Sequence, residues 1–173
     1  MEEIVTIEEA IKTAIDYETR VGILYADAVK QATDSTGKRV FGLLAGEEKQ
    51  HLKYLKSKLE EWQRTGKITP EKLQTAVPSR EAIMAEAGKL KAHMPSKPRG
   101  TELNLLTKAR DVETETSNFY KQMVAELSDE GQQMFAHFVR IEEGHLALVQ
   151  AELDALSGLG FWFDMPEFNL EAG

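Results

Sequence analysis

The chain has 173 residues, of which 42% are hydrophobic, and it carries a net charge of −8 and no cysteine. This length and composition are typical of a soluble globular protein, so residues 1–173 are predicted to form a single domain. The acidic charge argues against nucleic acid as a partner, because binding a phosphate backbone needs a concentrated field of Lys and Arg. The lack of cysteine excludes disulfides, cysteine nucleophiles and thiolate-bound metals, so a metal here must have nitrogen and oxygen ligands.

The N-terminal sequence and the lengths of the hydrophobic runs bear on location. The first ten residues, MEEIVTIEEA, have acids where a signal peptide would carry positive charge. No apolar run approaches the ~20 residues that a membrane-spanning helix requires. We therefore expect a cytoplasmic protein that does not bind membranes.

Apolar residues recur at three- and four-residue spacing in four long stretches, which is the period of a helix and not of a strand. The first helix is predicted over residues 6–33, starts at a capping box of Thr6 and Glu9, and ends at the turn DSTG over 34–37. The second is predicted over 38–64 and ends at Gly66, since glycine accepts the left-handed conformation that commonly closes a helix.

The third helix is predicted over residues 101–127, and the fourth over 129–157 with Ser128 as its cap. Between the two pairs lies a proline-rich connection, residues 66–100, with room for shorter helices such as 79–91. The short loops make each pair antiparallel, and the long connection joins one pair to the other. The pattern predicts an all-α fold, a four-helix bundle with one long crossover between helices 2 and 3.

Two segments of the chain repeat each other. Residues 16–25, DYETRVGILY, align without gaps on residues 111–120, DVETETSNFY, at an offset of 95. Two Glu-x-x-His pairs, Glu48 with His51 and Glu142 with His145, repeat at an offset of 94. These offsets predict two copies of a helical hairpin that face each other about a pseudo-twofold axis.

Each helical stripe of apolar residues reaches a glutamate where a hydrophobic residue would be expected. Four carboxylates in the interior of a bundle would each cost several kcal/mol or take up a proton, and they would repel one another. Two divalent cations would neutralise their four negative charges, and two neutral imidazoles would complete the ligand set. The predicted metal ligands are Glu18, Glu48, His51, Glu113, Glu142 and His145.

A spacing of three residues puts Glu and His on adjacent turns of one helix face, so both can reach the same ion. Glu48 and Glu142 are predicted to bridge the two ions, as in the helix-bundle pattern of di-iron carboxylate proteins. Glu18 and His51 would complete the ligand set of one ion, and Glu113 and His145 would complete that of the other. The alternative interpretation is that these residues are solvated helix charges.

Tyr25 and Tyr120 lie two turns beyond the glutamates of helices 1 and 3, on the same faces. Their hydroxyls either donate hydrogen bonds to metal-bound carboxylates or belong to the packed core.

These motifs make the chain resemble the rubrerythrin branch of the ferritin-like di-iron carboxylate superfamily, over about residues 4–157. The resemblance rests on Glu-x6-Tyr in helices 1 and 3 and on Glu-x-x-His in helices 2 and 4. It implies a ferritin-like four-helix bundle with two iron ions, and an oxidoreductase that reduces hydrogen peroxide or dioxygen. Manganese or a mixed-metal centre is the alternative, because oxygen and imidazole ligands suit both metals.

Two departures from that family matter. Rubrerythrins carry a rubredoxin-like domain whose iron has four cysteine ligands, so a chain without cysteine must receive electrons from a separate redox protein. They also carry a further helix-3 glutamate at the position of Thr116, and Glu115 does not replace it because it lies about 200° around the helix from Glu113. One rival is therefore a metal-binding or iron-handling protein without peroxide turnover. Another is a structural helix bundle that holds no metal.

Several other residues are set aside by the same geometry. Glu47, Glu115 and Glu143 fall off the apolar stripes and are predicted to be solvated. His93 and His137 lack a glutamate three residues earlier and are predicted not to be ligands. The C-terminal tail, residues 158–173, carries Phe161, Trp162, Phe163 and Phe168, which either pack over the end of the bundle or form a homodimer interface.

Overall fold

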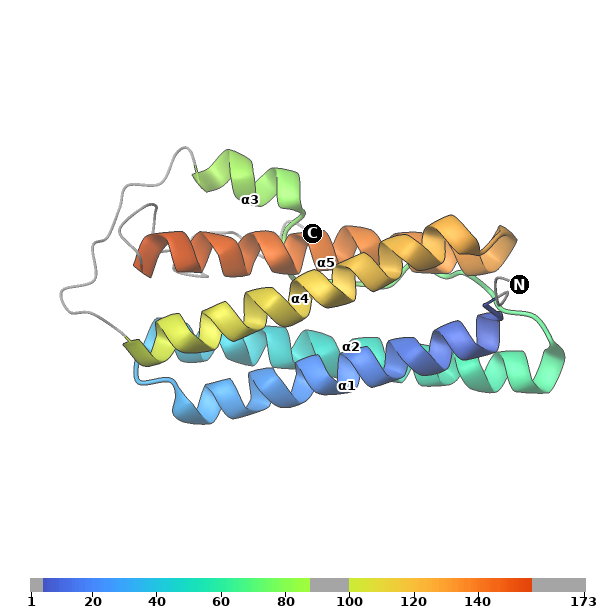
Figure 1. The fold of residues 1–173 in the computed structure, drawn as a ribbon, viewed down its shortest axis with the longest axis horizontal. Coiled ribbons are helices and arrows are strands. Elements are labelled where there is room, and N and C mark those ends of the chain that lie inside the picture. The colour runs from blue at the N-terminus through green and yellow to red at the C-terminus, as the bar shows by residue number, and fades with distance from the viewer. Residues whose placement is uncertain (1–4, 88–99, 157–173) are drawn as a thin grey trace.

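The computed structural model describes residues 5–87 and 100–156, and within these ranges it contains five helices and no strand (Figure 1). Four are long and lie side by side, and the short α3 packs against α5. The helices are α1 (Ile7–Gln31), α2 (Ser35–Thr65), α3 (Arg80–Ala87), α4 (Gly100–Glu126) and α5 (Asp129–Leu156). The all-α prediction is thus confirmed for the described residues.

The ends of the first two helices follow from local capping. The predicted capping box is present, with the Thr6 hydroxyl accepting from the backbone N–H of Glu9 at 3.2 Å and the Glu9 carboxylate accepting from the Thr6 N–H at 3.0 Å. The second helix begins three residues earlier than predicted, because the carboxylate of Asp34 accepts from the N–H of Gly37 at 3.0 Å and caps it. The predicted turn over 34–37 is therefore largely helical. Gly66, with φ 69°, ends α2 as predicted.

The helices of each pair are antiparallel, whereas α2 and α4 run in the same direction (Figure 1). As predicted, α5 starts directly after Ser128, whose carbonyl accepts from the N–H of Gln132 at 3.2 Å. The Ser128 hydroxyl donates to the carboxylate of Asp129 at 3.3 Å, and among the described residues no backbone N–H of α5 donates to it, so its side chain is not the predicted cap. Part of the predicted crossover, His93 and the aromatic tail lie outside the described residues. No helix in the described ranges is long and apolar enough to cross a membrane.

The interior consists of two apolar clusters separated by a polar layer. One cluster contains Tyr25 and Phe41, and the other contains Tyr120 and Phe138. On α1 the polar interruption is Glu18, which follows Ala14 of one cluster and precedes Val21 of the other; the remaining three long helices are interrupted in the same way. The fold therefore places all four interruptions in the same layer.

A buried carboxylate on α4 ties the α1–α2 loop to that helix. Glu102 is 1% exposed, and its Oε1 accepts from the N–H and hydroxyl of Thr33 and the N–H of Asp34, at 2.5 to 2.9 Å. Burial alone raises the pKa of Glu102, but these hydrogen bonds outweigh burial and hold the pKa below its usual value. Its contribution to stability is therefore present above the unfolded pKa and is lost as pH falls through the folded one.

We predict that Glu102→Ala lowers the free energy of unfolding by about 1–3 kcal/mol, because it removes the acceptor of three partly buried hydrogen bonds. Glu102→Gln keeps the acceptor oxygen and should lose less. Denaturant unfolding of the metal-free protein at neutral pH measures both, with the exposed Glu115→Ala as the control. Equal losses for the Ala and Gln variants would show that the negative charge, and not the acceptor, stabilises the loop.

Candidate metal centre

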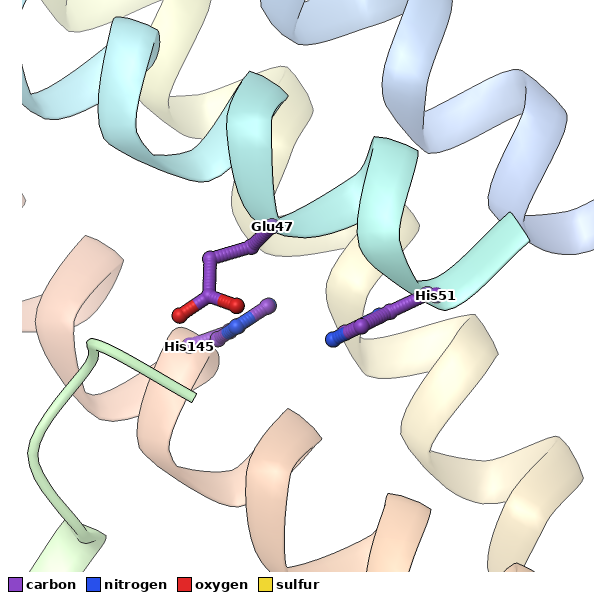
Figure 2. A group of neighbouring side chains, drawn as sticks. All are labelled: Glu47, His51 and His145. Carbon is purple, nitrogen blue, oxygen red and sulfur yellow. The ribbon is translucent and has the colours of Figure 1, made fainter. Parts of the chain in front are cut away.

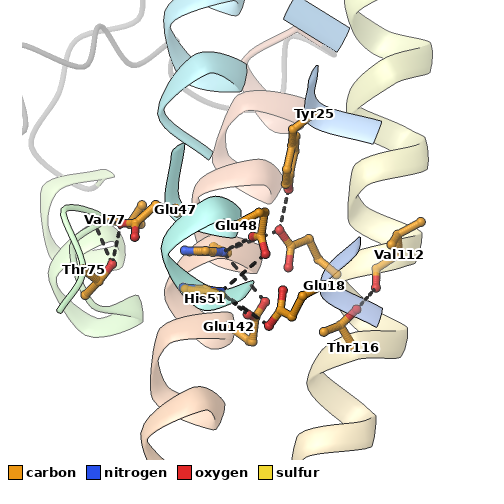
Figure 3. A network of polar contacts seen from close by, with 12 residues as sticks. Glu18, Tyr25, Glu47, Glu48, His51, Thr75, Val77, Val112, Thr116 and Glu142 are labelled. Carbon is orange, nitrogen blue, oxygen red and sulfur yellow. Dashed lines mark hydrogen bonds and ion pairs between the residues drawn. The ribbon is translucent and has the colours of Figure 1, made fainter. Parts of the chain in front are cut away.

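The six predicted residues meet in the polar layer, one glutamate from each long helix and one histidine each from α2 and α5 (Figure 3). Their exposed fraction is 0%. The set consists of Glu18, Glu48, His51, Glu113, Glu142 and His145. We call it the glutamate–histidine cluster.

One half of the cluster surrounds the ring of His51. Its Nδ1 lies 3.4 Å from each of three carboxylate oxygens. These are Oε1 of Glu18, Oε2 of Glu48 and Oε1 of Glu142. The four ligand atoms come from three helices and lie within 4.8 Å of one another.

The other half surrounds the ring of His145. Its Nδ1 lies 3.3 Å from Oε1 of Glu48, 3.6 Å from Oε1 of Glu113 and 3.8 Å from Oε2 of Glu142. Ligand atoms at about 2.1 Å from one ion, with bond angles near 90–110°, lie roughly 3.0–3.4 Å apart. In both halves, the distances from the histidine nitrogen to the carboxylate oxygens are therefore at or slightly above those between ligand atoms that share one ion.

Glu48 and Glu142 each divide their two oxygens between the halves. Oε2 of Glu48 faces His51 and Oε1 faces His145, whereas Glu142 presents Oε1 to His51 and Oε2 to His145. None of these four oxygens has a hydrogen-bond partner in the described ranges, nor do the ring nitrogens of either histidine. Buried polar atoms without partners are rare in proteins and call for a ligand or ion.

Two tyrosines support the outer glutamates, each from the opposite helix pair. The Tyr25 hydroxyl on α1 donates to Oε1 of Glu113 on α4 at 2.5 Å. The Tyr120 hydroxyl on α4 donates to Oε1 of Glu18 on α1, also at 2.5 Å. Both tyrosines are fully buried, so they are part of the core and also carboxylate partners. Core packing and a hydrogen bond to a carboxylate are therefore both confirmed, and metal binding by those carboxylates stays a prediction.

The charges of the metal-free cluster balance only with bound protons. Burial and the neighbouring Glu18 raise the pKa of Glu48 to about 8. Burial and the Glu18 and Glu113 carboxylates raise the pKa of Glu142 as well. Burial acts in the same direction on Glu18, but the charge of His51 and hydrogen bonds outweigh it, and the pKa of Glu18 falls to about 2.

The remaining members follow the same logic. Burial raises the pKa of Glu113, but His145 and Tyr25 outweigh it and lower that pKa. Burial lowers the pKa of both histidines, and the surrounding carboxylates raise it further than burial lowers it. Without metal, these shifts favour protons on Glu48, Glu142 and both histidines. Divalent cations that bind the cluster would compete with those protons.

Aromatic rings close the cluster on one side. The rings of Phe138 and His51 are nearly perpendicular, with centroids 5.5 Å apart, and Phe138 also stacks on Tyr120 at 4.8 Å. The two histidine rings stack on each other at 5.3 Å and 7°. These rings keep water away from the carboxylates and strengthen the electrostatic attraction of the cluster for cations.

The structure corrects one residue that the sequence assigned to solvent. Glu47 is 5% exposed, and its Oε1 accepts from the Thr75 hydroxyl and from the N–H groups of Ala76 and Val77 (Figure 3). The helix phase was correct, since Glu47 points away from the four glutamates, but residues 75–77 cover that face of α2. The internal repeat could have indicated this burial. At the 94-residue offset, Glu47 corresponds to the hydrophobic residue Ile141, which is buried.

The other residues that the sequence set aside lie outside the cluster. Glu115 is exposed, and Glu143 is partly buried and pairs with Lys121 at 3.7 Å. His137 is partly buried on α5. Thr116, where the resembled family has a glutamate, is buried and donates its hydroxyl to the carbonyl of Val112 at 2.8 Å (Figure 3).

Comparisons of the chain with protein-family models, with curated proteins and with solved structures found no significant match.

Proposed function

We propose that the glutamate–histidine cluster binds two divalent metal ions and that the chain is a non-haem di-iron oxidoreductase of the rubrerythrin type. In this proposal the four long helices form a ferritin-like bundle with one crossover. The observation that carries it is the divided carboxylates, since both oxygens of Glu48 and both of Glu142 face different histidines. A carboxylate in that arrangement would hold two bound ions, one with each oxygen.

The donor set fits iron. Four carboxylates and two imidazoles suit Fe(II) and Mn(II) better than copper, which prefers softer or more planar nitrogen-rich sites. When bound, two iron ions supply the redox chemistry, one electron each, which matches the two electrons that reduce hydrogen peroxide to two waters. Dioxygen is the second oxidant that such a centre would reduce.

In this mechanism the chain's own residues would hold the metal ions and orient the carboxylates that bind them. Tyr25 and Tyr120 fix one oxygen of Glu113 and Glu18, so that Oε2 of each carboxylate stays free of hydrogen bonds to described residues. These two hydroxyl groups also donate hydrogen bonds to the cluster, so each phenol oxygen would be an atom that holds a proton beside the metal ligands. Reduction of peroxide consumes two protons, and in this proposal a separate redox protein supplies the electrons.

Steady-state peroxide consumption tests the proposal. Protein loaded anaerobically with Fe(II) should consume many molecules of hydrogen peroxide per chain when an electron donor is supplied. Glu48→Ala, loaded in the same way, should consume none above free iron. Elemental analysis of protein purified without added metal should find iron, and its absence together with no uptake on loading would support a structural helix bundle.

Iron handling without turnover is the second candidate, and Thr116 favours it. Threonine has no carboxylate, and the Thr116 hydroxyl already donates to the carbonyl of Val112, so this position supplies no further acidic ligand. The distinction is kinetic. Iron-loaded protein that is oxidised once by peroxide and then stops, although donor is present, is an iron-handling protein and not a peroxidase.

A further inference from the structure

A carboxylate lies beside the two histidines on the side away from the four glutamates. An oxygen of Glu47 and one ring nitrogen each from His51 and His145 lie within 4.8 Å of one another (Figure 2). Because both Nδ1 atoms face the glutamates, the ring nitrogens on this side are the Nε2 atoms. Both Nε2 atoms are buried and have no hydrogen-bond partner in the described part of the chain.

Glu47 is itself held in place by an irregular segment, residues 75–79, which we call the strap. Its Oε1 accepts three hydrogen bonds from the strap, at 2.7 to 3.1 Å. Its Oε2 can therefore accept hydrogen bonds from other donors. On the opposite side, the strap packs on α5 at Gly144. A Cβ at Gly144 would lie 2.7 Å from the carbonyl oxygen of Pro78, so only glycine permits this approach.

The internal repeat is broken at the two positions that hold the strap. At the 94-residue offset, Glu47 corresponds to Ile141, and Gln50 corresponds to Gly144. One hairpin thus supplies the carboxylate and the other supplies the glycine. The six cluster residues match between the hairpins, so the two hairpins differ at the side of the histidines that faces Glu47 and not among the metal ligands.

A groove of about 920 Å³ runs along α2 and the strap, and Glu47 forms part of its wall. Its lining also includes Thr75 and Ala76 of the strap. Glu47 lines this groove and neither histidine does, so solvent has access to the carboxylate but not to the buried ring nitrogens.

We propose that Glu47 is a positioning residue for both histidines. When metal is bound, its carboxylate would accept the Nε2–H of His51 and His145 and so hold each imidazole in the tautomer whose Nδ1 lone pair faces the metal. A neutral imidazole has one N–H and one lone pair, so an acceptor at Nε2 decides which nitrogen can bind an ion. This inference rests on the metal site proposed above.

Glu47→Gln separates the two contacts of this side chain. The amide oxygen of Gln can still accept from the strap, whereas its NH2 group cannot accept from Nε2–H. Titration with Co(II) as the probe should find two ions bound to the full chain in both forms, with roughly 10- to 100-fold weaker affinity in Glu47→Gln. Glu143→Gln removes the same charge beside Glu142 and should bind Co(II) as the unaltered chain does.

Nitrogen-15 spectra of the Zn(II)-loaded protein distinguish tautomer control from a simple loss of negative charge. Slowly exchanging Nε2–H signals of both histidines should be present in the unaltered chain and should shift or disappear in Glu47→Gln. Unchanged signals in that variant would overturn the inference, even if affinity fell. Thr75→Val loosens the strap while keeping the carboxylate, and it should retain both signals.

Stoichiometry gives a further outcome. A third Co(II) ion that is lost in Glu47→Gln would make Glu47 a metal ligand and overturn its positioning role. If the unaltered chain binds no Co(II), the metal site itself is overturned. If the unaltered chain and Glu47→Gln bind Co(II) with equal affinity, only the inference about Glu47 is overturned.

Discussion

Glu48→Ala should abolish binding of both metal ions. The substitution removes Oε1, which faces His145, and Oε2, which faces His51, so each half of the cluster loses a ligand and the only remaining bridge is Glu142. Metal content after loading and desalting, measured by elemental analysis, should fall from two ions per chain to none. The metal-free variant should still fold, because the change removes a fully buried carboxyl group and not an apolar contact.

Glu115→Ala is the matched control, since Glu115 lies on the same helix as Glu113 but is exposed. It should retain both ions. One ion retained by Glu48→Ala would mean that Glu48 does not bridge. Loss of metal from Glu115→Ala would show that α4 is rotated relative to the arrangement described above.

Removal of metal should lower the melting temperature strongly. Metal binds the assembled cluster and hardly the unfolded chain, so at free metal 1,000-fold above the dissociation constant each site contributes about 4 kcal/mol. For a chain of this length, each kcal/mol shifts the melting temperature by roughly 2–4 °C. Chelation should therefore lower it by ~10 °C or more, as measured by calorimetry at neutral pH.

The control for chelation is Glu48→Ala, whose melting temperature should not respond to the chelator. A chelator effect on that variant would indicate metal bound elsewhere on the chain. An unchanged melting temperature of the unaltered protein after complete metal removal, verified by elemental analysis, would count against the cluster as a metal site.

The helical period predicted much of the fold, because each long helix buries one face and shows it in its apolar spacing. The six cluster residues could be found in the same way, since a glutamate or histidine that falls on a buried stripe is an exception to the pattern. The crossed tyrosine contacts could not be assigned from spacing alone. Which carboxylate Tyr25 reaches depends on how α1 packs on α4, and that is a property of the tertiary structure.

Glu47 shows where the sequence reasoning failed. Its position on α2 was predicted correctly, but burial there comes from residues 75–77, an irregular segment with no period of its own. The start of α2 was missed for a related reason, because Asp34 can cap a helix or begin a turn, and both patterns begin with the same residue. Local sequence does not decide which surface an irregular segment covers.

The exchange of tyrosine contacts between the hairpins has a consequence for assembly. Tyr25 reaches from the first hairpin to a carboxylate of the second, and Tyr120 reaches back to Glu18. Neither hairpin therefore completes its own polar interior, although each contributes two glutamates and one histidine to the cluster and one tyrosine that contacts it. Cooperative folding of the two halves is the expected result, since separating them would strand both phenols and all four acids at once.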